Sequence, residues 1–221
     1  MTGAVTSKPD VHDMVVVHRS FRQACAELPE LLRGLAPGET ARAALVVDAV
    51  RFMLTGLETH HTSEDEYLWP MLKSRAVEHA DAITNMETQH ERLEELVEQV
   101  THALDGLADD PEQSRCEKAA QQITELGAVL VAHMDEEENT VLPLVIDHLT
   151  VAEWETLGQV SLAKMEKKDL LRAFSALMAV ANPEEQQTIL TKAPLPARVM
   201  WRLVGRRSYA RWQARLRGAS H

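Results

Sequence analysis

The chain has 221 residues, 45% of them hydrophobic, which is enough to bury the core of one main domain. Its formal net charge is -11, which argues against a nucleic-acid-binding core, so no nucleic-acid partner is expected. No apolar run approaches the roughly 20 residues that cross a bilayer, and the first residues lack the pattern of a secretion signal. We therefore expect a cytoplasmic protein without a transmembrane segment.

The charge is distributed unevenly along the chain. Positions 1–185 hold 34 acidic and 15 basic residues, a net charge of -19. Positions 186–221 hold Lys192 and seven arginines but no acidic residue, a net charge of +8. An acidic body is thus followed by a basic tail, and the two parts need separate explanations.

Four long helices are predicted in the first part of the chain. Apolar residues recur with the helical period, and helix-favouring residues are plentiful. Breaks at "LAPGE", after Pro70, at "DGLADDP" and near Asp147 divide this part into helices of about 10–34, 40–72, 80–105 and 112–147. Short connections favour antiparallel neighbours. The sequence therefore predicts an all-α, up-down-up-down antiparallel four-helix bundle over residues 8–148.

A C-terminal helical extension is predicted over residues 149–221. Thr150 with Glu153 forms a capping-box pattern, and Asn182 followed by Pro183 is a typical helix start. The tail is amphipathic, with arginines on one side. Its apolar stripe is predicted to contain Trp201, Val204, Tyr209, Trp212 and Leu216. We expect the tail to fold back onto the acidic bundle; the alternatives are contact with a second copy of the chain or with a membrane surface.

The bundle segment contains an internal repeat. "HHTSEDEYLWPML" from His60 aligns with "HMDEEENTVLPLV" from His133 at an offset of 73, which superimposes two His-x-x-x-Glu pairs and two prolines. Upstream, His18 and His90 are 72 residues apart. Each half therefore has one histidine followed, on the next helix, by His-x-x-x-Glu and a proline. Because proline lacks an N–H group, each helix should kink or end just past this motif.

The spacing of the repeated motif points to a metal site. Residues four apart on a helix lie on the same face, so His60 and Glu64 can reach one point in the bundle core, as can His133 and Glu137. Imidazoles with carboxylates suit iron, and also zinc or manganese. With His18 and His90 these residues make six donors, and two irons bridged by Glu64 and Glu137 would use all of them economically. The alternative is a set of partly buried charged residues that satisfy one another.

The order His, His-x-x-x-Glu, His, His-x-x-x-Glu resembles the hemerythrin-like (HHE cation-binding) family over about residues 10–148. The resemblance implies a four-helix bundle with two non-haem iron ions, oxo- or hydroxo-bridged. The ligand roles that it implies fall on His18, His60, Glu64, His90, His133 and Glu137. A ferritin-like site would need Glu-x-x-His on two helices, and only Glu87 with His90 supplies that spacing.

Three further residues bear on the centre. Oxygen-carrying members of the family use five histidines, and the position of the fifth is Glu94 here, which we expect to accept a hydrogen bond from a ligand or to face water. Tyr67 lies on the helical face of His60 and is predicted to be an anionic metal ligand; a hydrogen-bond donor beside the site or a core aromatic residue are the alternatives. His61, rotated by about 100° from His60, is predicted to face outward or to lie behind the ligands.

The resemblance suggests peroxide, oxygen or nitric oxide as the small-molecule partner. The first functional hypothesis is an oxidoreductase that decomposes hydrogen peroxide or uses it as a peroxidase, with nitric oxide as one reductant to consider. The alternative is a module that binds or senses oxygen, nitric oxide or iron without turnover.

Overall fold

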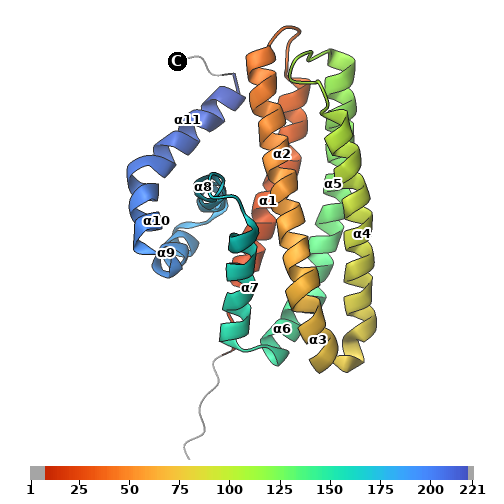
Figure 1. Ribbon diagram of the computed structural model, residues 1–221, viewed down its shortest axis with the longest axis vertical. Coiled ribbons are helices and arrows are strands. Elements are labelled where there is room, and N and C mark those ends of the chain that lie inside the picture. Colours follow the sequence, from red (N-terminus) through yellow and green to blue (C-terminus); the bar gives the residue numbers. More distant parts are fainter. Residues whose placement is uncertain (1–7, 219–221) are drawn as a thin grey trace, which may run out of the picture.

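A computed structural model describes residues 8–218, and all regular structure in this part of the chain is helical (Figure 1). The first part of the chain forms α1 (His12–Arg33); α2 (Thr40–Ser63), continued by η1 (Glu64–Leu68) and α3 (Trp69–Arg75); η2 (Val77–His79) and α4 (Ala80–Ala103); and α5 (Gln113–Glu136), continued by η3 (Glu137–Val141) and α6 (Leu142–His148). These bounds agree closely with the four predicted helices.

The four long segments form an antiparallel bundle. α1 packs against α2 and α5, and α4 packs against α5 and α2, which closes the ring (Figure 1). Consecutive segments run in opposite directions because their connections are short. The predicted all-α, up-down-up-down architecture is confirmed.

Two apolar clusters fill the bundle, and a polar layer separates them. The upper cluster contains Phe21, Leu57, Leu93 and Leu130; the lower cluster contains Met14, Leu68, Met86 and Val141. Each of the four segments therefore passes from one cluster to the other within a few residues, and the candidate donors lie at that crossing. Because the clusters keep water away on both sides, polar groups in the layer must find partners within the protein or in a bound ion.

The extension is helical throughout its described part. It comprises α7 (Val151–Lys164), α8 (Leu170–Val180), α9 (Pro183–Lys192), α10 (Leu195–Met200), η4 (Trp201–Gly205) and α11 (Arg206–Leu216). Thr150 and Asn182 both form capping boxes with the glutamate three residues on, as predicted. No helix of residues 8–218 is long and apolar enough to span a membrane.

The tail folds back onto the bundle as predicted, but mainly through apolar contacts. α8 packs against α1 and lies between the bundle and the arc of α9, α10 and α11 (Figure 1). Leu216 is buried in the upper cluster, and Trp212 packs against that cluster. The Arg172 guanidinium lies over the rings of both Phe52 and Trp212. Arg217 makes an ion pair with Glu27 of the bundle.

The predicted apolar stripe is wrong at one residue. Val204 is exposed, and Gly205 takes the inward position between Trp201 and Tyr209. η4 is a π turn, so each of its residues rotates the helix by less than the α-helical 100°, which shifts the inward face by one residue. A Cβ atom at Gly205 would lie 2.8 Å from the Trp201 ring, so this close approach requires glycine.

Candidate metal centre

Both His-x-x-x-Glu motifs end in a π turn. η1 begins at Glu64 and η3 begins at Glu137, the equivalent position of the repeat. In each turn a backbone N–H donates five residues back, from Trp69 to Glu64 and from Leu142 to Glu137. π turns are rare and often occur at functional sites. The two candidate carboxylates are thus presented by the same local distortion.

The π turns explain how two prolines fit inside continuous helices. Pro70 and Pro143 follow immediately, and in an α-helix each ring would clash with the carbonyl four residues earlier. Widening the preceding turn relieves that clash, so α3 and α6 continue beyond the prolines. The helices are therefore distorted at the glutamates themselves, before the prolines, and do not end there.

Five histidines and two glutamates converge in the polar layer. One donor group consists of His18, His60 and Glu137, and a second consists of His61, His90 and His133; within each group the donor atoms lie within 4.8 Å of one another. In the first group His18 Nε2 lies 3.2 Å from both His60 Nε2 and Glu137 Oε2. Two donors at about 2.1 Å from one ion and at right angles to it are about 3 Å apart, so this spacing suits a shared metal.

The two carboxylates connect the donor groups. Glu64 Oε1 is 3.4 Å from His60 Nε2, and Glu64 Oε2 is 3.6 Å from His90 Nε2. Glu137 Oε2 is 3.2 Å from His18 Nε2 and 3.9 Å from His133 Nε2. Each carboxylate therefore lies beside one histidine of each group, as a bridge between two ions requires.

His61 is buried, and the prediction that it faces outward is wrong. Its ring stacks on His90 with centroids 4.1 Å apart, and its Nε2 atom has no hydrogen-bond partner among the described residues. The repeat carried a signal for this position. At the offset of 73, His61 corresponds to Met134, a fully buried core residue. The equivalent position therefore faces inward in both halves.

The donors fit a bound cation because their hydrogen-bonding capacity is unused. Buried side-chain atoms without a hydrogen-bond partner include both carboxylate oxygens of each glutamate and three imidazole Nε2 atoms: Glu64, Glu137, His61, His90 and His133. Leaving so many buried polar atoms without partners would be strongly unfavourable in a metal-free core. Residues that only satisfied one another, the alternative reading of the motif, would not leave these atoms unpaired.

Three histidines are oriented by hydrogen bonds from the ring nitrogen that faces away from the layer. Nδ1–H donates from His18 to Glu138 at 2.8 Å, from His90 to Asp65 at 2.7 Å and from His133 to Gln89 at 2.9 Å. A proton on Nδ1 leaves the Nε2 lone pair directed into the layer, where a metal can bind it.

The first two of these bonds follow the internal repeat. Asp65 and Glu138 each follow a candidate bridging glutamate, and each reaches the first histidine of the opposite half. Asp65 also accepts a hydrogen bond from the Trp69 indole at 2.9 Å. The sequence analysis missed these two acids, although their equivalent places in the repeat could have revealed them.

Electrostatics keep most imidazoles neutral. Burial lowers the pKa of His60 to about 3, that of His133 to about 4, and that of His61 well below its ordinary value. Burial also acts to lower the pKa of His18, but the Glu137 carboxylate 3.2 Å away and the hydrogen bond to Glu138 outweigh it and raise that pKa. Neutral imidazoles are the form that binds metal.

The pKa values of the two candidate bridging glutamates are shifted in opposite directions. Burial, followed by the charge of Glu137, raises the pKa of Glu64 well above its ordinary value. Burial acts in the same direction on Glu137, but the close contact with His18 and the other neighbouring imidazoles lower its pKa to about 2. Without metal, the raised pKa values favour the protonated forms of His18 and Glu64. A cation that binds there must displace those protons, so binding is coupled to proton release.

Tyr67 is not brought into the set of donors. It is half-buried, packs against the lower cluster, and makes no hydrogen bond to the donors among the described residues. The π turn explains the displacement, because residues 64–68 rotate the helix by less than the prediction assumed. Glu94 is exposed, which confirms that it faces water.

Comparisons with known proteins agree with this geometry. A model of the hemerythrin HHE cation-binding domain matches residues 10–145. The zinc finger protein BRUTUS-like At1g18910 of Arabidopsis thaliana is 23% identical over 180 residues, which cover 80% of this chain but only 14% of that protein. No solved structure shows a significant match. The family model covers more than half of the chain, and the polar layer holds the donors that such a domain needs; the chain belongs to the hemerythrin HHE cation-binding domain family.

Proposed function

We propose that the chain binds two iron ions, one at each donor group, with Glu64 and Glu137 between them, and reacts with a small oxidant, hydrogen peroxide first. The observation that carries the proposal is the position of each carboxylate beside one histidine of each group. Seven nitrogen and carboxylate donors exceed the four that a single zinc ion uses. The distances would also let the carboxylates hold an oxo- or hydroxo-bridged pair.

Bound iron would supply the oxidation and reduction chemistry, and the protein would supply geometry and protection from bulk water. The His60 ring packs against Phe21 at 5.5 Å, and the His90 ring against Trp69 at 5.7 Å. All seven donors are buried. This enclosure favours molecules the size of peroxide, oxygen or nitric oxide over organic substrates. Catalase-like or peroxidase-like turnover, with nitric oxide as one reductant, fits these limits.

Glu138 provides one link between the layer and the surface. It lines a surface hollow of about 320 Å³ with Asp10 and His12, and it accepts the hydrogen bond from buried His18. Arg22 donates to the same Glu138 oxygen at 2.7 Å, which holds the carboxylate in place. A proton can reach His18 from this side through Glu138.

The experiment is peroxide consumption by the iron-loaded full chain, followed as oxygen release, with iron content measured on the same sample. We expect about two irons per chain and turnover that Glu137→Ala abolishes. Glu94→Ala is the matched control, because it removes an exposed glutamate from the same bundle. Turnover no faster than that of free iron at the same concentration would contradict the enzyme and leave metal binding intact.

A second function, sensing of oxygen, nitric oxide or iron without turnover, is supported by one contact. His18 is a candidate ligand, and its neighbour Arg19 donates to Glu185 of α9 at 2.7 Å. That hydrogen bond lowers the pKa of Glu185 to about 2. α1 thus connects the donors to the extension directly. Hydrogen exchange of α9 that changes when ligand is added would support sensing, and unchanged exchange would oppose it.

A further inference from the structure

The outer face of α10 and η4 is unusually apolar. It exposes Leu195, Val199, Met200, Leu203 and Val204, each with between 44% and 70% of its surface accessible. These are five of the eight large hydrophobic residues exposed in the described part of the chain, and they fall within ten positions. Spacings of three and four residues link them along one side of the helix. Clustering of this kind marks an interaction site.

This face is held in place from its inner side. Trp201 packs edge-on against Phe174 of α8, with ring centroids 5.8 Å apart. Gly205 is buried and lies next to Leu171 and Ser175. Leu216 anchors the end of α11 in the upper cluster. The exposed side chains are therefore displayed on an ordered helix and cannot be covered by a simple rotation of it.

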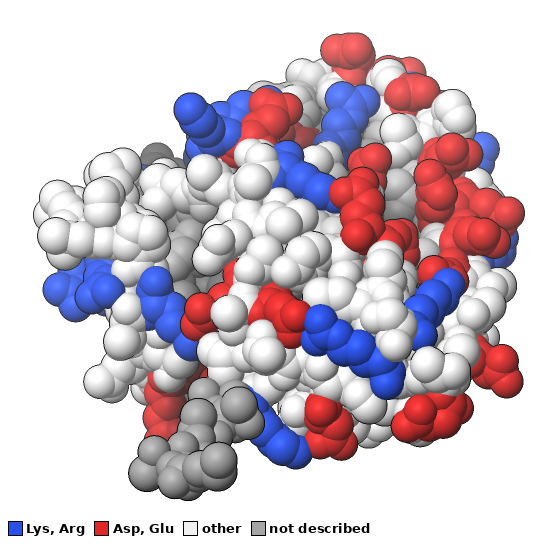
Figure 2. Space-filling view, turned by 60° about the horizontal axis from the view of Figure 1, so that its bottom comes forward, with Lys and Arg blue, Asp and Glu red and all other residues white. Residues whose placement is uncertain are grey.

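Basic residues surround the apolar face. No acidic residue follows Glu185 in the chain. Within residues 8–218, five exposed arginines of this segment make no ion pair: Arg202, Arg206, Arg207, Arg211 and Arg215. Figure 2 shows this edge of the molecule, at its left, as an uncharged lobe with basic side chains beneath it. The partner of this surface must therefore offer an apolar region to the aliphatic side chains and negative charge to the arginines.

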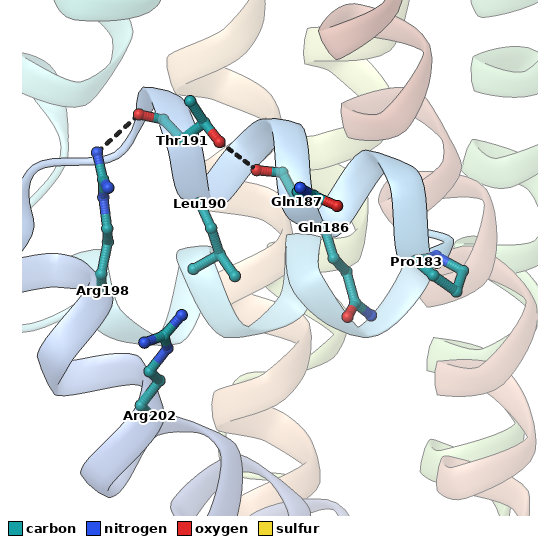
Figure 3. Close-up of a pocket in the computed structure, with 7 residues that line it drawn as sticks. All are labelled: Pro183, Gln186, Gln187, Leu190, Thr191, Arg198 and Arg202. Carbon is teal, nitrogen blue, oxygen red and sulfur yellow. Dashed lines mark hydrogen bonds between the residues drawn. The ribbon is translucent and has the colours of Figure 1, made fainter.

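A groove beside the apolar face also combines apolar and basic side chains. α9 and α10 enclose a hollow of about 400 Å³ lined by Gln187, Leu190, Arg198 and Arg202 (Figure 3). Arg198 donates to the carbonyls of Ala193 and Thr191 and is thereby fixed. Arg202 has no such partner among the described residues, and Figure 3 shows its side chain near that of Leu190. Its free guanidinium can bind a phosphate in two-point fashion.

We propose that α10, η4 and α11 bind peripherally to an anionic phospholipid bilayer. The aliphatic side chains enter the boundary between headgroups and acyl chains, and the arginines pair with lipid phosphates. The acidic α4 lies on the opposite edge of the molecule (Figure 1). At physiological salt the Debye length is about 8 Å, so repulsion from that distant edge is screened. This inference does not depend on the proposed function.

The test is sedimentation of the full chain with two kinds of vesicle, phosphatidylcholine alone and phosphatidylcholine mixed with phosphatidylglycerol. We expect binding to the anionic vesicles only, weakened by added salt. Leu195→Glu with Leu203→Glu should reduce binding about tenfold or more, since both insertion and charge are opposed. Replacing Arg202 or Arg206 by Gln should weaken binding about fivefold for each arginine.

The matched control is Val77→Glu with Leu162→Glu, which makes the same changes at two exposed apolar residues outside this face. It should bind as the unmodified chain does. Thermal unfolding of each variant separates loss of binding from loss of folding. The proposal is overturned if the unmodified chain ignores anionic vesicles or if both double variants bind equally. It is also overturned if the face instead forms a dimer that Leu195→Glu with Leu203→Glu dissociates.

Discussion

The two hairpins that build the centre, α1 with α2 and α4 with α5, differ at one buried donor position. His61 in the first hairpin corresponds to Met134 in the second. Otherwise the repeat keeps the same plan: a histidine, a His-x-x-x-Glu motif, a π turn and a proline. The repeat thus builds a symmetric frame for the two ions that we propose, and one imidazole makes the donor groups unequal. We expect the metal nearer His61 to differ from its neighbour in ligands and in affinity.

Removing a carboxylate shared by both groups should have the largest effect. In Glu137→Ala, each group loses its contact with that residue, so we expect metal affinity to fall by more than the roughly 10- to 100-fold that loss of an outer partner costs. Iron content after dialysis measures the effect. Full iron content in Glu137→Ala would contradict a bridging role, and Glu94→Ala should retain its iron.

His61→Met should come next and should act on one site. The change copies the residue of the second hairpin into the first, so the site near His90 and His133 loses an imidazole while the other site keeps its ligands. Iron content should fall from about two ions per chain toward one. The control is His102→Met, which replaces an exposed histidine. Equal loss of both irons in His61→Met would mean that the sites are not independent.

Replacing either acid that accepts a hydrogen bond from a candidate ligand, Asp65 or Glu138, should weaken metal binding to a similar extent. Asp65→Asn and Glu138→Gln each weaken the acceptor for one histidine, His90 in one half and His18 in the other. Each should lower metal affinity by about 10- to 100-fold. Competition with a chelator gives the two values. A large effect from only one variant would show that the halves are unequal in their outer contacts as well as at His61.

Acid should destabilise the metal-free protein, and His61 contributes to this. Its pKa is lowered by burial in the folded chain, so between that pKa and about 6.5 the unfolded chain binds one more proton than the folded chain. Stability then falls as pH decreases below about 6.5. His61→Met should reduce the loss between pH 7 and pH 5 by up to about 2 kcal/mol. Denaturant unfolding at both pH values checks this, and an unchanged difference would argue against a neutral buried His61.

Tyr67→Phe should have the smallest effect. Because Tyr67 packs against the lower cluster and makes no hydrogen bond to the donors in the described residues, we expect iron content and the visible spectrum to be unchanged. Loss of a visible absorption band in the variant would restore Tyr67 as a ligand.

The fold was predictable because it depends on features that are local in sequence. Helical periodicity, the breaks and the two capping boxes at Thr150 and Asn182 are each decided by nearby residues. Six of the seven convergent donors were likewise indicated by i, i+4 spacing and by the repeat. The short distances between groups then follow from packing four such helices around one core.

The errors share a cause: the direction of each side chain was predicted from a fixed rotation of about 100° per residue. Tyr67 and Val204 were placed with 100° per residue, but both lie in π turns, where the rotation is smaller. His61 was judged by its angle from His60 alone. In a four-helix ring, a residue on the flank of one helix can face the next helix and still be buried, and only packing decides which occurs.

The most direct test of the central claim is anomalous diffraction at the iron edge from crystals of the iron-loaded chain. Our account predicts two peaks in the polar layer, one at His18 and His60 and one at His61, His90 and His133. Both peaks should lie at about 2.0–2.3 Å from oxygens of Glu64 and Glu137. A single peak, no peak after loading, or a second peak remote from His61 would contradict it.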